Sequence, residues 1–296
     1  MNTLAFSLRT VCQHNADGSL MTQAQRERGL SMIAGELRRL GYRLPAATSL
    51  KPKHVQHLVA HWRQKGICDA TIKNRLGWMR WWAMKVNKPG LVPRDNAELG
   101  VGERTTFRGR PADATPRELI DRLANERMRL AVRLQRAFGL RYEESLKFRV
   151  AEADKGTVLV LRPSWTKGGR ARTVPIVHPG QRDLLDLVRE VAGDGSLIPE
   201  GMTYIAFRRR MDRETLKAGA TNLHRNRHWY ARWRYRTLAD VLAPADGGPL
   251  HNDVSPAERA RLDAVRMEVS REMGHGRLAV TDAYLGGRWR AKGGQG

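Results

Sequence analysis

The sequence predicts a mainly α-helical protein of two domains, the second of which contains one small antiparallel sheet. Apolar residues recur at steps of three and four along most of the chain, which is the period of an amphipathic helix. Only residues 157–162 and 172–176 have the composition of strands, and a Gly-bearing turn joins them. Polar residues and helix breakers gather over residues 100–116, so we place the domain boundary in this segment of the 296-residue chain.

The composition indicates a polyanionic partner. Lys and Arg number 53 against 30 Asp and Glu, which gives a net charge of +23 that is spread through all the expected elements. This distribution is typical of a folded surface that binds phosphates. The chain has no apolar stretch of about 20 residues and no signal-peptide pattern, so we expect a cytoplasmic protein. Its two cysteines, Cys12 and Cys68, lack metal-ligand spacing, so we expect neither a disulfide framework nor a metal site.

Helices are expected across residues 21–99, after a leader of irregular structure over residues 1–20. Two of these helices are indicated by their apolar faces, which are Leu30, Ile33, Leu37 and Leu40 in the first and Val55, Leu58, Val59 and Trp62 in the second. A third begins at Asp69, a suitable N-cap, and has the apolar face Ile72, Leu76, Met79 and Ala83. Its other side bears a basic stripe that either contacts phosphates or is simply solvated, formed by Lys73, Arg75, Arg80 and Lys85.

The second domain, residues 117–296, is expected to contain several helices besides the two strands. It opens with one helix that ends at Gly139 and has the apolar face Leu119, Leu123, Leu130, Leu134 and Phe138. Further helices are expected from Tyr142, over 180–192, 203–218 and 228–242, and from near Thr281. Ser255, Pro256 and Glu258 form the pattern of a capping box with a first-turn proline, for a helix that continues to about Met273.

Tyr284 is the residue on which a chemical function can be built. A tyrosine phenol can form an ester with a backbone phosphate when cations surround it, although an aromatic residue in a helix more often packs in a core. Arg141 and Arg227 carry planar, permanently charged groups that fit two phosphate oxygens at once. Taken singly, each arginine of so basic a chain is better explained as a surface charge.

His224, His275 and Lys167 are candidates for acid and base groups. His224 lies three residues before Arg227, so the two share one helical face, and His275 follows Gly274 in a turn. Lys167 lies at the tip of the hairpin, where its ammonium group could protonate a leaving oxygen. Each has a more ordinary explanation as a packing or surface residue. The order of all six candidates along the chain therefore has to decide between a catalytic role and these ordinary explanations.

Four stretches resemble the motifs of the tyrosine recombinases, the family of the lambda-type phage integrases. FGLRYEESL resembles the first arginine box, WTKGGRARTVPI the lysine hairpin, HRNRH the His-x-x-Arg-His box, and EMGHGRLAVTDAYL the Gly-His box with its tyrosine. The match spans residues 141–284 and contains all six positions in family order. It implies an N-terminal helical, SAM-like core-binding domain over residues 21–99, a basic linker over 100–116 and a catalytic domain over 117–296.

The resemblance implies a site-specific recombinase that cleaves and rejoins double-stranded DNA. Tyr284 would attack the scissile phosphate and form a 3′-phosphotyrosyl bond, which stores the bond energy, so neither a nucleotide cofactor nor a metal is implied. The other roles carried over are phosphate binding for Arg141, Arg227 and His275, general acid for Lys167, and base or hydrogen-bond partner of the tyrosine for His224.

The family also implies a setting and an assembly. We expect a homotetramer on two recombination sites, accessory DNA-bending proteins, association with the nucleoid, and a bacterial or phage mobile genetic element as the origin. Glu144, at an acidic position of the arginine box, either supports the site from behind or is an exposed helix carboxylate.

Two other functions share much of this pattern. A type IB topoisomerase uses similar residues but relaxes DNA without exchanging partners, and a decayed integrase would retain only a DNA-binding regulatory role. The sequence also departs from the family pattern in three places. Asn226 stands where an apolar residue is more common, the loop-like residues 245–253 lengthen the interval between Arg227 and His275, and LGGRWRAKGGQG after Tyr284 leaves the exchange of tails between protomers open.

Overall fold

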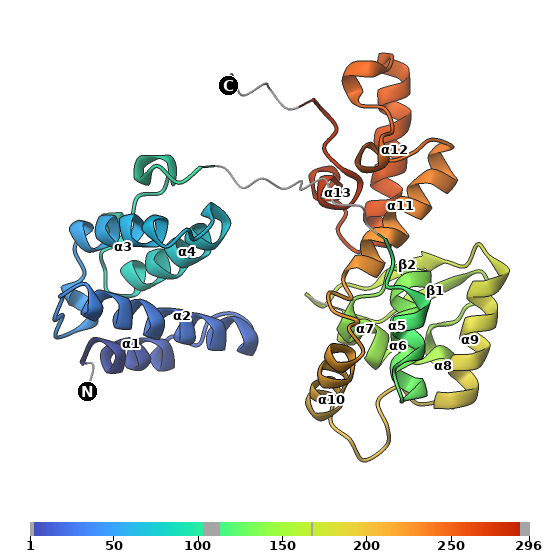
Figure 1. The fold of residues 1–296 in the computed structure, drawn as a ribbon, viewed down its shortest axis with the longest axis horizontal. Coiled ribbons are helices and arrows are strands. Elements are labelled where there is room, and N and C mark those ends of the chain that lie inside the picture. The colour runs from blue at the N-terminus through green and yellow to red at the C-terminus, as the bar shows by residue number, and fades with distance from the viewer. Residues whose placement is uncertain (1–2, 103–112, 167, 291–296) are drawn as a thin grey trace. The chain divides into compact units, whose positions relative to one another are not determined.

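The computed structural model describes residues 3–102, 113–166 and 168–290, which belong to two compact units, Met1–Thr105 and Thr106–Gly296 (Figure 1). The division falls inside the segment 100–116, where the sequence places the domain boundary. Both units are mainly helical and the second contains a two-stranded sheet, so the predicted fold class is confirmed. Within the described residues, no helix is long and apolar enough to span a membrane.

The N-terminal unit is a bundle of four α-helices. They are α1 (Thr3–His14), α2 (Leu20–Arg39), α3 (Pro52–Gln64) and α4 (Asp69–Lys85), followed by short turns of 3-10 helix at Pro89–Leu91 and Ala97–Leu99. The three apolar faces expected from the sequence form its core, apart from Leu40, which is only partly buried. Glu36 of α2 lies within this core and accepts a hydrogen bond from Trp62 Nε1 of α3 at 2.8 Å. This buried hydrogen bond gives α2 and α3 a directional contact within the apolar core.

The expected leader is wrong, because most of it is helix α1. Leu4 and Leu8 lie one helical turn apart and are both buried against α2, which explains why the segment is ordered. The polar residues that suggested a leader form only the short break between the helices, where Ser19 Oγ accepts a hydrogen bond from the backbone N–H of Thr22. A smaller correction concerns α4, whose N-cap is Cys68 and not Asp69.

The C-terminal unit places one small sheet among nine α-helices of the described residues. Strands β1 (Val158–Leu161) and β2 (Arg172–Pro175) are antiparallel, with Val158 opposite Pro175 and Leu161 opposite Arg172. The helices up to β1 are α5 (Arg117–Asp121), α6 (Glu126–Phe138), α7 (Tyr142–Lys147) and α8 (Val150–Ala153). Those after β2 are α9 (Pro179–Ala192), α10 (Tyr204–Lys217), α11 (Arg225–Ala239), α12 (Pro256–Glu272) and α13 (Leu278–Leu285).

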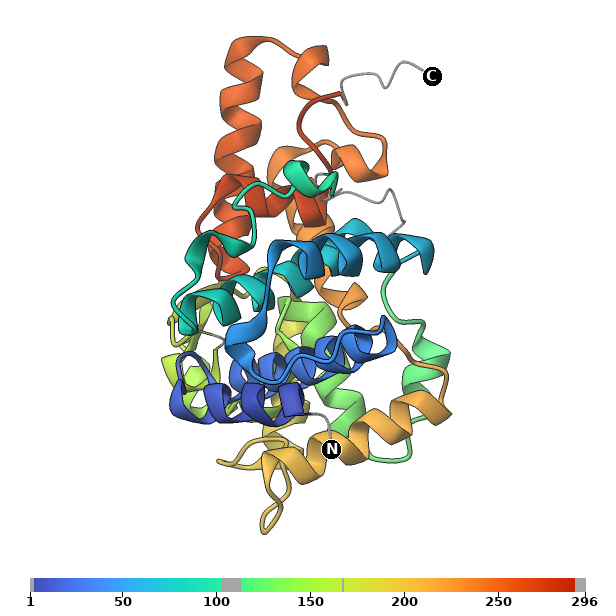
Figure 2. The same ribbon diagram turned by 90° about the vertical axis from the view of Figure 1, so that its left-hand side faces the viewer.

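Helices α6 and α11 form the centre of this unit. α6 packs against α9 on one side and α11 on the other, and α11 contacts both α12 and α13. α11, α12 and α13 accordingly lie side by side in both ribbon views (Figure 1 and Figure 2). The three helices that carry the second arginine box, the Gly-His turn and the tyrosine are therefore held together by direct packing.

Two local predictions for this unit need correction. The single helix expected up to Gly139 is two helices, because Asn125 interrupts it and caps α6 by accepting a hydrogen bond from Met128 N–H. Only half of the predicted capping box forms at α12. Ser255 Oγ accepts from Glu258 N–H at 3.2 Å, but the Glu258 carboxylate binds Arg261.

Candidate active site

Two of the candidate arginines converge on one main-chain carbonyl. Arg141 Nη2 donates to the carbonyl oxygen of Met273 at 3.3 Å, and Arg227 Nη2 donates to the same oxygen. Arg141 precedes α7, and it can approach because Gly139 has a positive φ of 58° and leaves room for the ring of Tyr230. Residues that are 86 positions apart in sequence thus present their guanidinium groups to one point.

The hydroxyl of Tyr284 lies beside Arg227. It is 3.4 Å from Arg227 Nε and 3.3 Å from His275 Nε2, and the Tyr284 side chain is largely buried. Both histidines of the HRNRH box lie near its ring, at centroid distances of 6.1 Å for His224 and 4.7 Å for His228. His228 is a neighbour that the sequence analysis missed, although it lies one helical turn after His224 and so shares its face.

All three imidazoles next to Tyr284 are held in the neutral form. Burial, together with the nearby Arg227 and Arg141, lowers the pKa of His275 to about 4. Burial and then His224 lower the pKa of His228 to about 4, and burial and Arg227 also lower the pKa of His224. A neutral imidazole keeps one nitrogen free to accept a proton, which an imidazolium does not.

Glu144 is fully buried and joins two arginines, so it is not an exposed helix carboxylate. Its carboxylate binds Arg141 Nη1 at 2.7 Å and both terminal nitrogens of Arg172 at 2.7 and 2.8 Å. Burial acts to raise the pKa of Glu144, but the ion pairs with Arg172 and Arg141 outweigh it and lower the pKa. The carboxylate is therefore ionised at neutral pH and orients Arg141.

Arg172 is the second residue that the sequence analysis missed. It lies in the quoted stretch WTKGGRARTVPI, and its strand β2 alternates buried and exposed positions, with Arg172 and Val174 on the buried face. A charged residue on the inner face of a strand requires a partner of opposite charge, and this signal was available in the sequence.

The cluster retains an excess of positive charge. Arg141 and Arg172 share the Glu144 carboxylate, whereas Arg227 forms no ion pair with a carboxylate of the described residues and donates to the uncharged carbonyls of Gly139 and Met273. Burial lowers the pKa of Arg227 to about 10, which leaves the guanidinium charged at neutral pH. Buried positive charge that the protein itself does not neutralise favours binding of an anion such as a phosphate.

A cavity of about 1190 Å³ lies next to this cluster, of which Arg141 and Glu144 line it directly. Its lining includes Arg141, His224, His275 and Tyr284, together with further basic residues at its edge, Arg170, Arg208 and Arg277. Lys167 lies outside the described residues, but its neighbour Gly168 lines the cavity. No three His, Cys, Asp or Glu side chains of the described ranges lie together as metal ligands.

A buried cluster behind the cavity fixes the shared carbonyl. Glu272 directly precedes Met273, and its carboxylate accepts hydrogen bonds from Tyr230 at 2.8 Å and from Arg234 Nε at 2.9 Å. Tyr230 and Arg234 belong to α11, the helix that also carries Arg227. The cluster therefore ties the end of α12, and with it the Met273 carbonyl, to the helix of the second arginine.

Removing Glu272 should destabilise the protein. We expect Glu272→Ala to lower the free energy of unfolding by about 3 kcal/mol, because Arg234 would remain buried without its main partner. Glu268→Ala is the matched control, since Glu268 lies on the same helix and binds the same Arg234 at 3.5 Å but is half exposed. It should cost less than about 1 kcal/mol. Urea unfolding of the full-length variants measures both values, and equal losses would contradict this account.

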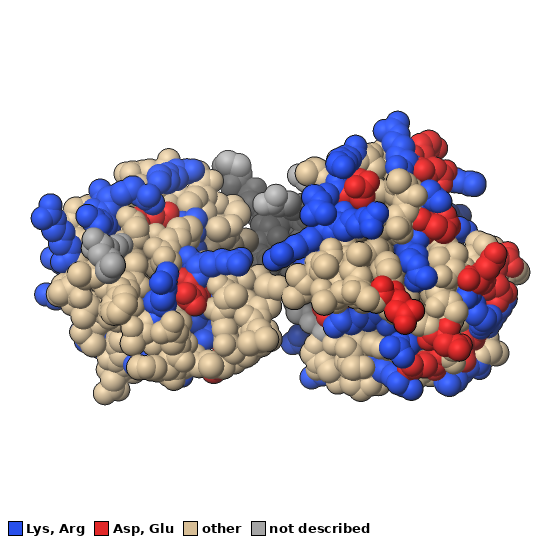
Figure 3. Space-filling model, turned by 90° about the horizontal axis from the view of Figure 1, so that it is seen from below, with Lys and Arg blue, Asp and Glu red and all other residues tan. Residues whose placement is uncertain are grey.

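The basic stripe of α4 has partners inside the N-terminal unit. Arg75 binds Glu36 at 3.3 Å, Arg80 donates to the Pro93 carbonyl and to Asn96 at 2.8 Å, and Lys85 lies 3.9 Å from Asp17. Lys73 is partly buried. These contacts show what the stripe does in the free protein, which is to hold α4 to its neighbours. Other Lys and Arg side chains are widely distributed over the face of the molecule shown in Figure 3.

Asn226, one of the departures from the family pattern, is fully buried. Its Oδ1 atom accepts a hydrogen bond from the backbone N–H of Thr115 at 2.8 Å. The polar side chain thus anchors the segment that leads into α5 onto the start of α11. An apolar residue at this position would leave that buried N–H without this acceptor.

Comparisons with known proteins agree with this architecture. Residues 1–88 match the family described as phage integrase, N-terminal, whereas no curated protein matches the sequence significantly. The solved structure of the lambda integrase (75–356) dimer bound to a COC′ core site has a TM-score of 0.62 at 15% identity, over 99% of this chain and 100% of that chain.

Two other recombinase structures are similar. The Tn1549 transposon integrase in complex with circular intermediate DNA has a TM-score of 0.56 at 15% identity, over 96% of this chain and 95% of that chain. The XerH recombinase in a post-cleavage complex with a palindromic difH substrate has a TM-score of 0.57 at 17% identity, over 95% of this chain and 80% of that chain. The chain has the fold of the tyrosine recombinases, and the expected resemblance to this family is confirmed.

Proposed function

We propose that this protein is a site-specific DNA recombinase of the tyrosine type, active in DNA integration and recombination. The observation that carries the proposal is the position of the Tyr284 hydroxyl, which lies within hydrogen-bonding distance of both Arg227 and His275 in a basic cavity. A phenol in that position can attack a phosphate bound by the two arginines, and the cations around it stabilise the charge that develops on the phosphate oxygens.

The reaction consists of two balanced transfers. In cleavage, Tyr284 Oη bonds to phosphorus, the bond from phosphorus to the 5′ oxygen breaks, and Lys167 donates a proton to that oxygen. The phenolic proton passes to His275, the imidazole that contacts the hydroxyl, which revises the assignment of this role to His224. His224 then serves the phosphate. In rejoining, a 5′-hydroxyl of the partner duplex attacks the phosphorus of the phosphotyrosyl ester and the bond from phosphorus to Tyr284 Oη breaks. The attacking hydroxyl gives its proton to Lys167, and His275 returns the phenolic proton to Tyr284.

The proposal extends to the partners. Double-stranded DNA is the substrate, in agreement with the net charge and with the DNA bound in the related structures. Exchange between two sites requires four protomers, so we propose a homotetramer on paired sites, with accessory DNA-bending proteins and location in the nucleoid. Lys73, Arg75, Arg80 and Lys85 remain proposed DNA contacts, and three of them would have to exchange an internal partner for a phosphate.

Trapping of the covalent intermediate tests the proposal. A duplex nicked near the cleavage site loses a short fragment after attack, so the adduct cannot rejoin and accumulates. Sites selected from random duplexes for tight binding serve as the substrate. We expect a protein–DNA adduct that resists denaturing electrophoresis, and mass spectrometry should locate the nucleotide on the peptide that contains Tyr284. Specific binding without any adduct would instead support a regulator that only binds DNA.

The neutral histidines predict an unusual pH dependence. Because the pKa of His275 is about 4, its neutral, proton-accepting form persists down to that pH, and activity is lost only as the pH falls through it. The adduct rate at subsaturating DNA should therefore stay level between about pH 5.5 and 8. Circular dichroism at each pH controls for unfolding. A fall centred near pH 6.5 would contradict the lowered pKa.

A further inference from the structure

The loop between α11 and α12 holds the residues that follow the tyrosine. We call residues 244–253 the clasp and residues 286–290 the tail segment. The backbone N–H of His251 donates to the carbonyl of Arg288 at 2.8 Å, and Arg290 is bound twice, through its N–H to Asn252 Oδ1 at 3.2 Å and through Nη2 to Asp253 Oδ1 at 2.8 Å. The insertion that lengthens the family pattern is thus in direct contact with the segment after α13 of the same chain.

Close packing accompanies these hydrogen bonds. Gly286 has a φ of 88°, and a Cβ atom placed on it would lie 2.7 Å from the backbone nitrogen of Ala245, so the two main chains touch. The ring of Trp289 packs edge-on against His251 with 4.8 Å between the centroids. The clasp therefore fits both the main chain and a large side chain of the tail segment.

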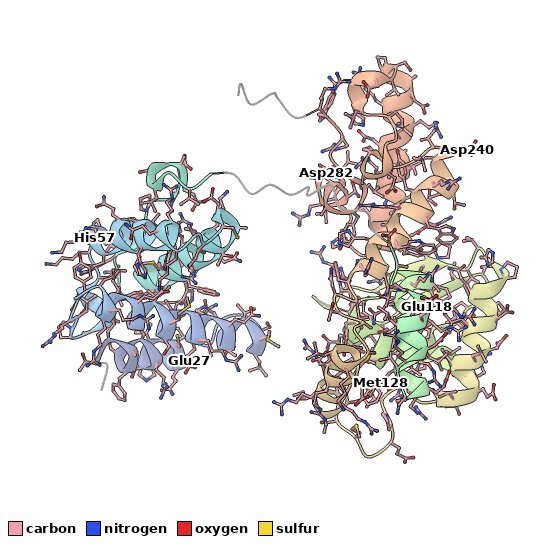
Figure 4. All side chains as sticks on the ribbon, in the orientation of Figure 1. Glu27, His57, Glu118, Met128, Asp240 and Asp282 are labelled. Carbon is pink, nitrogen blue, oxygen red and sulfur yellow. The ribbon has the colours of Figure 1, made fainter. Side chains whose placement is uncertain are left out.

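Two buried arginines connect the clasp and the tail segment to the nucleophile. Arg232 of α11 donates to Asp246 Oδ1 at 2.6 Å and to the carbonyl of Tyr284 itself at 3.0 Å. Arg266 of α12, which is fully buried, donates to Asp282 at 3.1 Å and to the carbonyl of Gly286 at 3.1 Å. Asp282, labelled in Figure 4, lies on α13 together with the tyrosine. Movement of the clasp would therefore displace Tyr284 through a single side chain, that of Arg232.

We propose that the clasp is a built-in acceptor for the tail segment, which holds Tyr284 in the cavity of its own chain before any second protomer binds. The proposal rests on the proposed function, because it names Asp246, Asn252 and Asp253 as positioning residues for the nucleophile assigned there. The tail segment, which the family resemblance would lend to a neighbouring protomer, is retained instead by the chain that carries it. Each protomer is then competent for cleavage on a single half-site.

Full-length Asp246→Ala tests the clasp with two measurements. Trypsin cleaves after Arg288 only when the tail segment opens, so the variant should be cut at least about fivefold faster there than the wild type. The rate of adduct formation on a nicked half-site should fall about tenfold, because Tyr284 is less often aligned, while the affinity for DNA stays unchanged. Asp186→Ala, which removes an exposed carboxylate on α9, is the matched control and should change neither rate.

A charge exchange separates positioning from general damage to the fold. Asp253→Arg or Arg290→Asp alone should speed cleavage after Arg288, whereas the double variant should restore protection because the pair is re-formed in reverse. The proposal is overturned if Asp246→Ala changes neither rate, or if a mixture of Tyr284→Phe and Arg141→Ala protomers regains adduct formation, which would require a tyrosine supplied by another chain. A wild type that forms no adduct would defeat the proposed function, but the protease measurement would still decide on the clasp.

Discussion

Tyr284→Phe is expected to abolish the covalent adduct. The phenyl ring fills the same space beside His224 and His228 but lacks the side-chain oxygen that would bond to phosphorus. Without this oxygen the phosphotyrosyl ester cannot form, so the rate of adduct formation should fall on the order of 10⁴-fold or more. Denaturing electrophoresis of the variant with the nicked duplex measures it, and DNA affinity should remain at the level of the wild type.

Tyr235→Phe is the matched control for this experiment. Tyr235 is also a buried tyrosine of the C-terminal unit, but it packs near Arg266 and does not line the cavity. Its loss should leave the adduct intact. An adduct that persists in Tyr284→Phe would reject Tyr284 as the nucleophile. A plasmid assay distinguishes a recombinase from a topoisomerase, since relaxation of a supercoiled plasmid without recombinant products would indicate a topoisomerase.

Arg227→Ala is expected to have the next largest effect. The guanidinium contacts the Tyr284 hydroxyl and carries charge that no carboxylate of the described residues neutralises directly, so it is free to stabilise a phosphate in the transition state. Removal of one such group lowers a reaction rate by about 10²–10³-fold. We expect a loss of this size in the single-turnover rate of adduct formation. Arg227→Lys should recover only part of it, because an ammonium cannot bind two oxygens in one plane.

Arg236→Ala supplies the comparison, because Arg236 is exposed near the end of the same helix and carries the same charge. Its adduct rate should stay within about threefold of the wild type, since surface charges away from a site act only through screened, long-range attraction. If Arg227→Ala and Arg236→Ala were equally active, the convergence of the arginines on Met273 would have no catalytic meaning. Circular dichroism of both variants shows whether the buried position tolerates alanine.

The candidate site could be predicted from the sequence because its members lie in short motifs with fixed internal spacing. His224 and Arg227 are one helical turn apart, and His275 and Tyr284 flank a single turn and helix, so local geometry already limits where they can point. The apolar faces of α2, α3 and α4 could be predicted equally well, because their apolar residues recur at steps of three and four in the sequence.

The features that were not predicted from the sequence depend on contacts between distant segments of the chain. Arg172 pairs with Glu144 across 28 positions, and Glu272 binds Tyr230 across 42, so no local pattern connects the partners. Helix α1 was overlooked although Leu4 and Leu8 are spaced one helical turn apart, because this short spacing becomes informative only when α2 covers both residues. The same holds for the stripe on α4, where the pairing of Arg75 with Glu36 depends on how the bundle packs.

The carbonyl that receives both arginines belongs to the main chain, so the side chain at position 273 has no part in it. Substitution of Met273 can alter packing but cannot delete the acceptor. The sensitive position is Gly274, whose φ of 72° sets the direction of that peptide and whose Cβ, if it had one, would lie 2.9 Å from Arg172 Cδ. Random mutagenesis of this turn should therefore accept other apolar side chains at the buried position 273, whereas any side chain at position 274 would be rejected.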